Sequence, residues 1–172
     1  MKKTKVVLDA DVIIHFHKGG CLSSLPSFLE EFDFVVLKYV YDEVLPPTRN
    51  ALNNQINFLK NITLIEDDFI GEIAHIYALL RRNPKMGKGE SACMAYCQCT
   101  QNVIGSSNTR DIKEYCIEHQ ITYLTTWDFL YYAWVRHKMS EDDIANFVST
   151  VNAQGSILPS HDLHTYVPST QI

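Results

Sequence analysis

Four acidic residues of this chain each stand beside a predicted strand end or helix start. They are far apart in the sequence, so only the fold can gather them. The carboxyl ends of parallel strands and the starts of the following helices share one edge of a sheet, and there we expect the four to converge. Converging carboxylates repel one another and partly protonate unless divalent cations neutralise them. The four are Asp9, Glu43, Glu90 and Asp111.

Carboxylate oxygens are hard ligands, so we predict Mg²⁺ as the preferred cation and Mn²⁺ as the second choice. Zinc would require His and Cys at short, regular spacing. Cys93, Cys97 and Cys99 have no matching His or Cys pair downstream, and they lie in a segment of small residues. We therefore interpret these three cysteines as packed side chains rather than as metal ligands.

Asp9 carries the strongest signal because it follows the apolar run at residues 6–8. A charge beside a buried strand needs a cation, a partner or solvent. Asp11 is interpreted either as a side chain that supports the same site or as a cap of the following turn. Glu90 and Asp111 also suit ordinary helix starts, where an acid interacts favourably with the helix dipole. For Glu43 the alternative is a solvent-facing position on a short helix.

The densest basic run lies just before Glu90. Runs like this usually form a solvated face. Beside a metal site, however, the same residues are placed to hold a phosphate backbone while the metal contacts the scissile group. The candidate phosphate-binding residues are Arg81, Arg82, Lys85 and Lys88.

The elements that must position these residues alternate between strand and helix. No helix is predicted between residue 9 and a turn at Gly19-Gly20. His15 and His17 are interpreted as loop or surface residues, and the alternative is that they reach a substrate phosphate. The apolar stripe from Phe69 to Leu80 predicts a helix that starts at Asp67-Asp68 and faces the core. Strands are predicted at residues 4–9, 34–37, 62–65, 102–106 and 121–124. Helices are predicted at residues 24–32, 39–45, 48–60, 67–80, 90–100, 111–118, from Thr126 onward, and 140–155.

This alternation predicts an α/β fold, a three-layer α/β/α sandwich with a mostly parallel central sheet. We expect one domain over residues 1–155 and a C-terminal extension over 156–172 that covers a sheet edge or a partner. Asp128 is predicted to be a first-turn acid of an aromatic helix, and the alternative is that it lines the acidic site.

The composition limits the classes of function. A chain of 172 residues, 46% of them hydrophobic, suits a single core. The net charge of −5 argues against a generally basic nucleic-acid coat, so any nucleic-acid contact is local or metal-assisted. Five cysteines without a signal peptide predict reduced thiols in a cytoplasmic protein. No segment reaches the roughly 18 apolar residues that a membrane span needs.

Four motifs resemble those of PIN-domain proteins, a metal-dependent nuclease family. Residues 7–14, VLDADVII, are similar to the family opening "LDTNVLI", and residues 40–45, VYDEVL, resemble its second acidic motif. Residues 87–92, GKGESA, resemble a "GxGE" helix entrance, and residues 104–112, IGSSNTRDI, resemble its "TNNTRDF" segment. The resemblance covers residues 5–155 in order, which makes four individually weak motifs fairly specific.

The resemblance implies a PIN-like fold and an Mg²⁺- or Mn²⁺-dependent endoribonuclease with Asp9, Glu43, Glu90 and Asp111 as catalytic metal ligands. It also implies an antitoxin partner, RNA as substrate and a homodimer. The chain departs from the family at Ser107 and Asn108, where many members carry acids. These two residues and Asp11 are expected to contact the metal ligands and hold them in place. The alternative function is a non-catalytic binding module with a degraded metal site.

Overall fold

The computed structural model describes residues 3–172 and has a five-stranded sheet at its centre. The strand order is β3-β2-β1-β4-β5, and every pairing is parallel. β1 and its two neighbours consist mainly of Val, Ile, Leu and Phe, which suits strands buried on both faces. The strands are β1 (Lys5–Leu8), β2 (Asp33–Leu37), β3 (Ile62–Ile65), β4 (Val103–Gly105) and β5 (Tyr123–Leu124).

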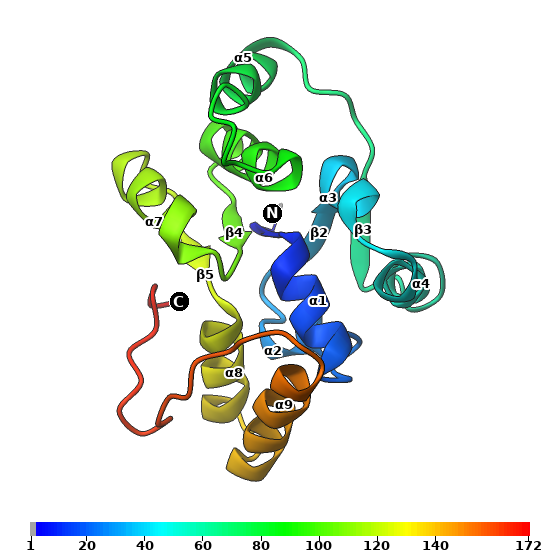
Figure 1. Cartoon of the computed structure of the whole chain (residues 1–172), viewed down its shortest axis with the longest axis vertical. Helices are drawn as coiled ribbons and strands as arrows, with labels where there is room; N and C mark the ends of the chain where they lie inside the picture. Colours follow the sequence, from blue (N-terminus) through cyan, green and yellow to red (C-terminus); the bar gives the residue numbers. More distant parts are fainter. Residues whose placement is uncertain (1–2) are drawn as a thin grey trace.

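Helices cover both faces of this sheet. α5 and α6 lie on one side, while α1, α8 and α9 lie on the other (Figure 1). The predicted three-layer α/β/α class is therefore confirmed, with a sheet that is wholly parallel in the described residues. The helices are α1 (Ala10–Lys18), α2 (Leu25–Phe28), α3 (Lys38–Glu43), α4 (Pro46–Asn54), the π-helical turn η1 (Gln55–Leu59), α5 (Gly71–Leu80), α6 (Lys88–Thr100), α7 (Thr109–Glu118), α8 (Thr126–Val135) and α9 (Glu141–Ala153).

Helix α1 corrects the expectation that no helix follows β1. The Asp9 side chain accepts a hydrogen bond from the Ala10 backbone N–H and caps the helix. Val12, Ile13 and Phe16 are buried at helical spacing. The phenyl ring of Phe16 packs against the rings of three other elements, so α1 belongs to the core. Those rings are Phe28, Phe129 and Phe147.

Other helix starts also differ from prediction. Thr48 lies inside α4, which begins at Pro46, because proline suits the first helical position. The predicted cap at Thr126 is one residue late, since the Thr125 hydroxyl accepts from the Asp128 N–H. The helix predicted at 24–32 is only the short α2.

Helix α5 begins at Gly71 rather than at Asp67-Asp68, and none of its residues is fully buried. Its Tyr77 packs against Tyr39 and Phe69 with ring centroids 4.9 and 5.6 Å away. The predicted apolar stripe therefore faces a half-buried aromatic cluster instead of the central core.

The segment after α9 folds back along α8 and β5, as predicted for a sheet-edge cover (Figure 1, red). The Thr170 hydroxyl donates to the carbonyl of Tyr123 in β5, at 3.0 Å. Farther along, the Trp127 indole N–H donates to the Pro159 carbonyl at 2.8 Å. Within residues 3–172, no helix combines the length and the apolar character needed to cross a bilayer.

Candidate functional site

Asp9 lies at the carboxyl edge of the sheet, directly after the central strand β1. Its backbone N–H donates to the Gly105 carbonyl at 2.8 Å, which joins the ends of β1 and β4. One carboxylate oxygen accepts from the Ala10 N–H, and the other accepts from the Ser106 hydroxyl at 3.1 Å. Only 7% of Asp9 is exposed. Burial raises the pKa of this carboxyl, and the nearby charge of Glu43 raises it further.

Glu43 and Glu90 approach the same edge from α3 and α6. Gly89 allows this approach, because a Cβ at that position would lie 2.6 Å from Oε2 of Glu43. Glu90 is 7% exposed in the first turn of α6. Burial, followed by the charges of Asp9 and Asp111, raises the pKa of Glu90 to about 7. Glu43 is exposed on α3, as its solvent-facing alternative predicts, and its charge acts on Asp9, which in turn interacts with Glu90.

Asn108 joins the third and fourth predicted ligands. Its side-chain amide donates to Oε1 of Glu90 and to Oδ2 of Asp111, both at 2.8 Å. An amide N–H pair thus lies between two carboxylates and offsets part of their repulsion. The predicted support by Asn108 takes this form, with the amide nitrogen rather than the oxygen facing the acids.

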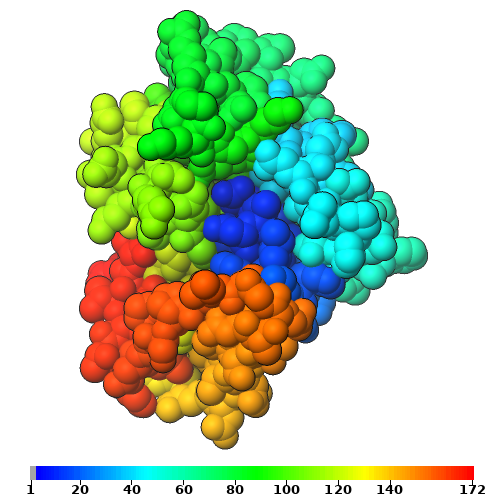
Figure 2. All heavy atoms as spheres, in the orientation of Figure 1, coloured from blue at the N-terminus to red at the C-terminus, as the bar shows by residue number. Residues whose placement is uncertain are grey.

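The four acids are therefore neighbours in pairs. Figure 2 shows the blue N-terminal segment surrounded by the cyan, green and yellow-green segments that contain α3, α6 and α7. As the side chains of residues 3–172 stand, no three His, Cys, Asp or Glu groups form a ready metal cage. The donor set nevertheless fits a divalent cation in chemistry, since Asp9 and Glu90 offer buried carboxylate oxygens whose pKa values are raised by burial first and by neighbouring acids second.

Asp11 supports the loop that follows β4. Its Oδ2 accepts from the Ser107 N–H at 2.8 Å, and its Oδ1 accepts from the Val12 N–H. Burial, with the charge of Asp9 next, raises the pKa of Asp11 to about 7. Of the two predicted alternatives, Asp11 thus combines a local backbone contact in α1 with a contact that supports the site.

Ser107 connects this loop to α8. Its hydroxyl donates to the Thr126 hydroxyl at 2.8 Å and accepts from the Thr126 backbone N–H at 2.9 Å. Nδ1 of His15 lies 2.9 Å from the same Thr126 oxygen, and burial lowers the pKa of His15 to about 4. Sequence reasoning missed this network. The signal was the spacing of Asp11 and His15, which places both on one face once α1 is recognised.

The basic run surrounds the start of α6. The Arg81 guanidinium donates to the Met86 carbonyl and shapes the loop. Arg82, Lys85 and Lys88 are exposed, and none of them forms an ion pair with another residue in the part of the chain that the structure describes. These three side chains are free to meet an anionic ligand.

Asp128 does not join the acidic group. It is fully buried, and its carboxylate accepts from the Thr125 N–H at 2.7 Å. The same carboxylate accepts from the Tyr166 hydroxyl and the Ser169 N–H, both at 2.8 Å. Asp128 is thus a first-turn acid, as predicted, and it also holds the C-terminal segment. Cys93 and Cys97 are buried thiols.

Comparisons with known proteins find solved structures that are similar to this chain, two of which are described here. FitAcB from Neisseria gonorrhoeae is 15% identical, with a TM-score of 0.41 over 71% of this chain and 98% of that chain. FitAB bound to an IR36 DNA fragment is 14% identical, with a TM-score of 0.43 over 71% of this chain and 95% of that chain. No protein-family model matches the chain, and no curated protein matches it. The fold assignment rests on the strand order and parallel pairing of the chain itself.

Proposed function

We propose that this protein is a PIN-type, metal-dependent endoribonuclease that hydrolyses RNA phosphodiesters. The proposal is supported by the pairwise interactions among Asp9, Glu43, Glu90 and Asp111 near the carboxyl edge of the sheet, in the order that the family resemblance implies. Isolated carboxylates this close destabilise the folded chain. A group of them is better explained by a bound cation than by packing.

Asp9 and Glu90 would hold an Mg²⁺ or Mn²⁺ ion from the buried side, and Glu43 and Asp111 would complete the oxygen ligands. When bound, such an ion supplies Lewis acidity for phosphodiester hydrolysis. Asn108 orients Glu90 and Asp111 toward each other through its two hydrogen bonds. Asp11 and Ser107 fix the loop behind them.

Arg82, Lys85 and Lys88 are proposed to hold the RNA backbone next to this site, with Arg81 shaping their loop. Phosphate contacts position a nucleic acid without reading its sequence, so these residues set affinity rather than the cleavage site. RNA as the substrate, an antitoxin as the partner and a homodimer as the assembly follow from the PIN resemblance.

RNA cleavage tests the proposal directly. Purified protein is incubated with defined single-stranded RNA and Mg²⁺ or Mn²⁺, beside Asp9→Asn and the exposed control Asp67→Asn. We expect metal-dependent cutting by the wild type and Asp67→Asn and a loss of at least about 100-fold in Asp9→Asn. Equal cutting by all three proteins, or no cutting with either metal, would overturn the proposal.

Metal binding separates the enzyme from its alternative, a non-catalytic module. Millimolar Mn²⁺ at about 100 times its dissociation constant would stabilise the folded protein by roughly 2.7 kcal/mol. The melting temperature of the wild type should rise, and that of Asp9→Asn should not. An unchanged melting temperature in the wild type favours the binding module.

A further inference from the structure

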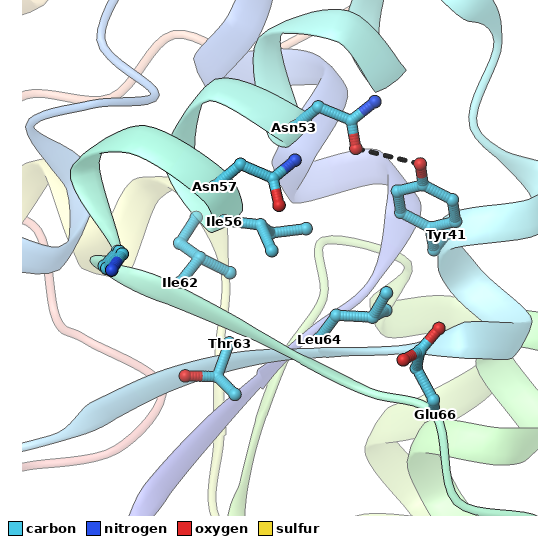
Figure 3. A pocket seen from close by; sticks show the side chains of 9 residues that line it. Tyr41, Asn53, Ile56, Asn57, Ile62, Thr63, Leu64 and Glu66 are labelled. Carbon is cyan, nitrogen blue, oxygen red and sulfur yellow. Dashed lines mark hydrogen bonds between the residues drawn. The ribbon is translucent and has the colours of Figure 1, made fainter.

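A groove of about 530 Å³ lies between the α4–η1 segment and β3, with Tyr41 of α3 in its wall (Figure 3). Pockets that hold small ligands have volumes of roughly 300–1,000 Å³. Glu66, which also lines the groove, directly follows β3, and Tyr41 precedes Glu43 by two residues in α3. This end of the groove therefore lies toward the carboxyl edge of the sheet, beside the acidic group.

Tyr41 forms an aromatic wall of the groove. Its hydroxyl donates to Oδ1 of Asn53 at 2.8 Å, which fixes the orientation of the ring. Two half-buried apolar side chains, Ile56 and Leu64, line the groove next to it. An aromatic ring beside apolar side chains suits the flat face of a nucleobase, because stacking on such a ring stabilises a bound base.

Two cations lie near the Tyr41 ring. The guanidinium carbon of Arg49 is 5.4 Å from the ring centroid, and Nζ of Lys38 is 5.9 Å from it. Lys38 pairs with Asp42, whereas Arg49 forms no ion pair among residues 3–172. The charge of Arg49 is therefore available to a phosphate that flanks a base in the groove.

The polar side chains of the groove match one kind of base edge. The Asn57 amide is exposed, and the one hydrogen bond among the residues drawn in Figure 3 joins Tyr41 to Asn53. Asn57 can thus offer a ligand a donor and an acceptor, while the exposed Glu66 carboxylate offers acceptors alone. Adenine presents its N6 amino donor beside the N7 acceptor, which is the edge that an asparagine amide pairs with at both atoms.

We propose that this groove is a subsite for an unpaired adenine of the RNA substrate, which stacks beside Tyr41, pairs with Asn57 and selects where the strand is cut. The inference rests on the proposed function, since it takes single-stranded RNA as the ligand. It supplies a sequence preference that the phosphate contacts of Arg82, Lys85 and Lys88 do not provide.

Nucleotide binding in EDTA tests the groove without metal or cleavage. AMP and IMP differ at the purine 6-position, where IMP replaces the amino group by oxygen. In calorimetric titrations of the wild type, we expect AMP to bind about tenfold more tightly than IMP. Asn57→Ala should lose this difference, and the control Asn54→Ala should keep it, because Asn54 is exposed on the same segment outside the groove.

Substitutions at Tyr41 test the stacking wall. Tyr41→Leu should weaken the binding of AMP and of IMP alike by about tenfold, since stacking does not depend on the 6-substituent. Tyr41→Phe keeps the ring and should retain most of the affinity for both. Far-UV circular dichroism confirms that each variant is folded.

Cleavage mapping connects the groove to the acidic group. A defined single-stranded RNA with one adenosine, and the same RNA with inosine at that position, are incubated with Mg²⁺ or Mn²⁺. The wild type and Asn54→Ala should cut at a fixed distance from the adenosine. Inosine in the RNA, or Asn57→Ala in the protein, should remove this preference.

Two binding results would overturn the adenine subsite: equal affinity of the wild type for AMP and IMP, or a preference for AMP that survives Asn57→Ala. A protein that cuts RNA without regard to adenosine keeps the nuclease assignment and loses the subsite. A protein that prefers AMP through Asn57 and cuts no RNA keeps an adenine-binding groove and loses the nuclease assignment.

Discussion

Replacing Glu90 by glutamine removes the charge of this side chain and keeps its shape, so it measures how much the charge destabilises the folded protein. Glutamine keeps an oxygen that can accept the Asn108 hydrogen bond, which is 2.8 Å long in the wild type. It removes the charge whose burial and neighbours raise the pKa of Glu90 to about 7. In the metal-free protein above pH 7, we therefore expect Glu90→Gln to be more stable than the wild type.

The size and sign of this effect follow from proton linkage. The raised pKa means that the folded protein keeps the Glu90 proton between about pH 4.5 and 7 while the unfolded chain has lost it, so wild-type stability falls as pH rises through this window. A rise in the pKa of Glu90 from 4.5 to about 7 corresponds to at most ~3 kcal/mol of stability, and solvent at the partly open site reduces this to roughly 1.5 kcal/mol. For a chain of this size, that is a gain of about 3–6 °C in melting temperature.

Thermal unfolding in EDTA, followed by circular dichroism from pH 4.5 to 8.5, measures this difference. The curves of the two proteins should nearly coincide at pH 4.5 and separate up to about pH 8. Added Mn²⁺ should then raise the melting temperature of the wild type more than that of the variant. A variant that is less stable at pH 8, or a difference that does not change with pH, would refute the electrostatic account.

Three further predictions concern other parts of the molecule. Gly89→Ala should cost about 1–3 kcal/mol in thermal unfolding and weaken Mn²⁺ binding, because the new methyl group displaces the Glu43 carboxylate. Asp128→Ala should cost ~3 kcal/mol, since it leaves the Ser169 N–H unpaired, and hydrogen exchange should rise in the C-terminal segment but not in β1. Lys85→Ala should lower the salt dependence of RNA binding by about 0.7 in log–log slope, measured by fluorescence anisotropy, without moving the cleavage site.

Most of the strands could be predicted from the sequence, because the buried parallel strands are short apolar runs with clear ends. The predicted strand at residues 62–65 coincides with β3. The same apolar signal failed at α1, where acids at positions 9 and 11 divide the run into pieces that resemble a strand end. Asp9 both ends the segment of β1 and caps helix α1. Because one residue occupies both positions, the sequence pattern does not distinguish a strand end from a helix start.

The site was predictable to the extent that strand order could be inferred. The residues placed after strands or at helix starts are neighbours in pairs, since Glu43 acts on Asp9 and Asn108 connects Glu90 to Asp111, and a parallel sheet brings such points to one edge. The hydrogen bonds that hold them could not be predicted, since Asn108, Ser107 and Thr126 are common loop residues whose partners depend on loop conformation. The roles of Ser107 and Asn108, where the chain departs from the family motif, follow from these hydrogen bonds.

The buried carboxylate of Asp128 has a consequence for the order of folding. Two of its hydrogen-bond donors, Tyr166 and Ser169, lie 38 and 41 residues farther along the chain. During synthesis α8 therefore emerges from the ribosome with a carboxylate that its own surroundings satisfy only in part. The contacts of the C-terminal segment with Asp128 join residues far apart in the sequence, so they form late in folding. A chain whose translation stops before residue 166 therefore leaves α8 and the edge of β5 uncovered and prone to misassociation.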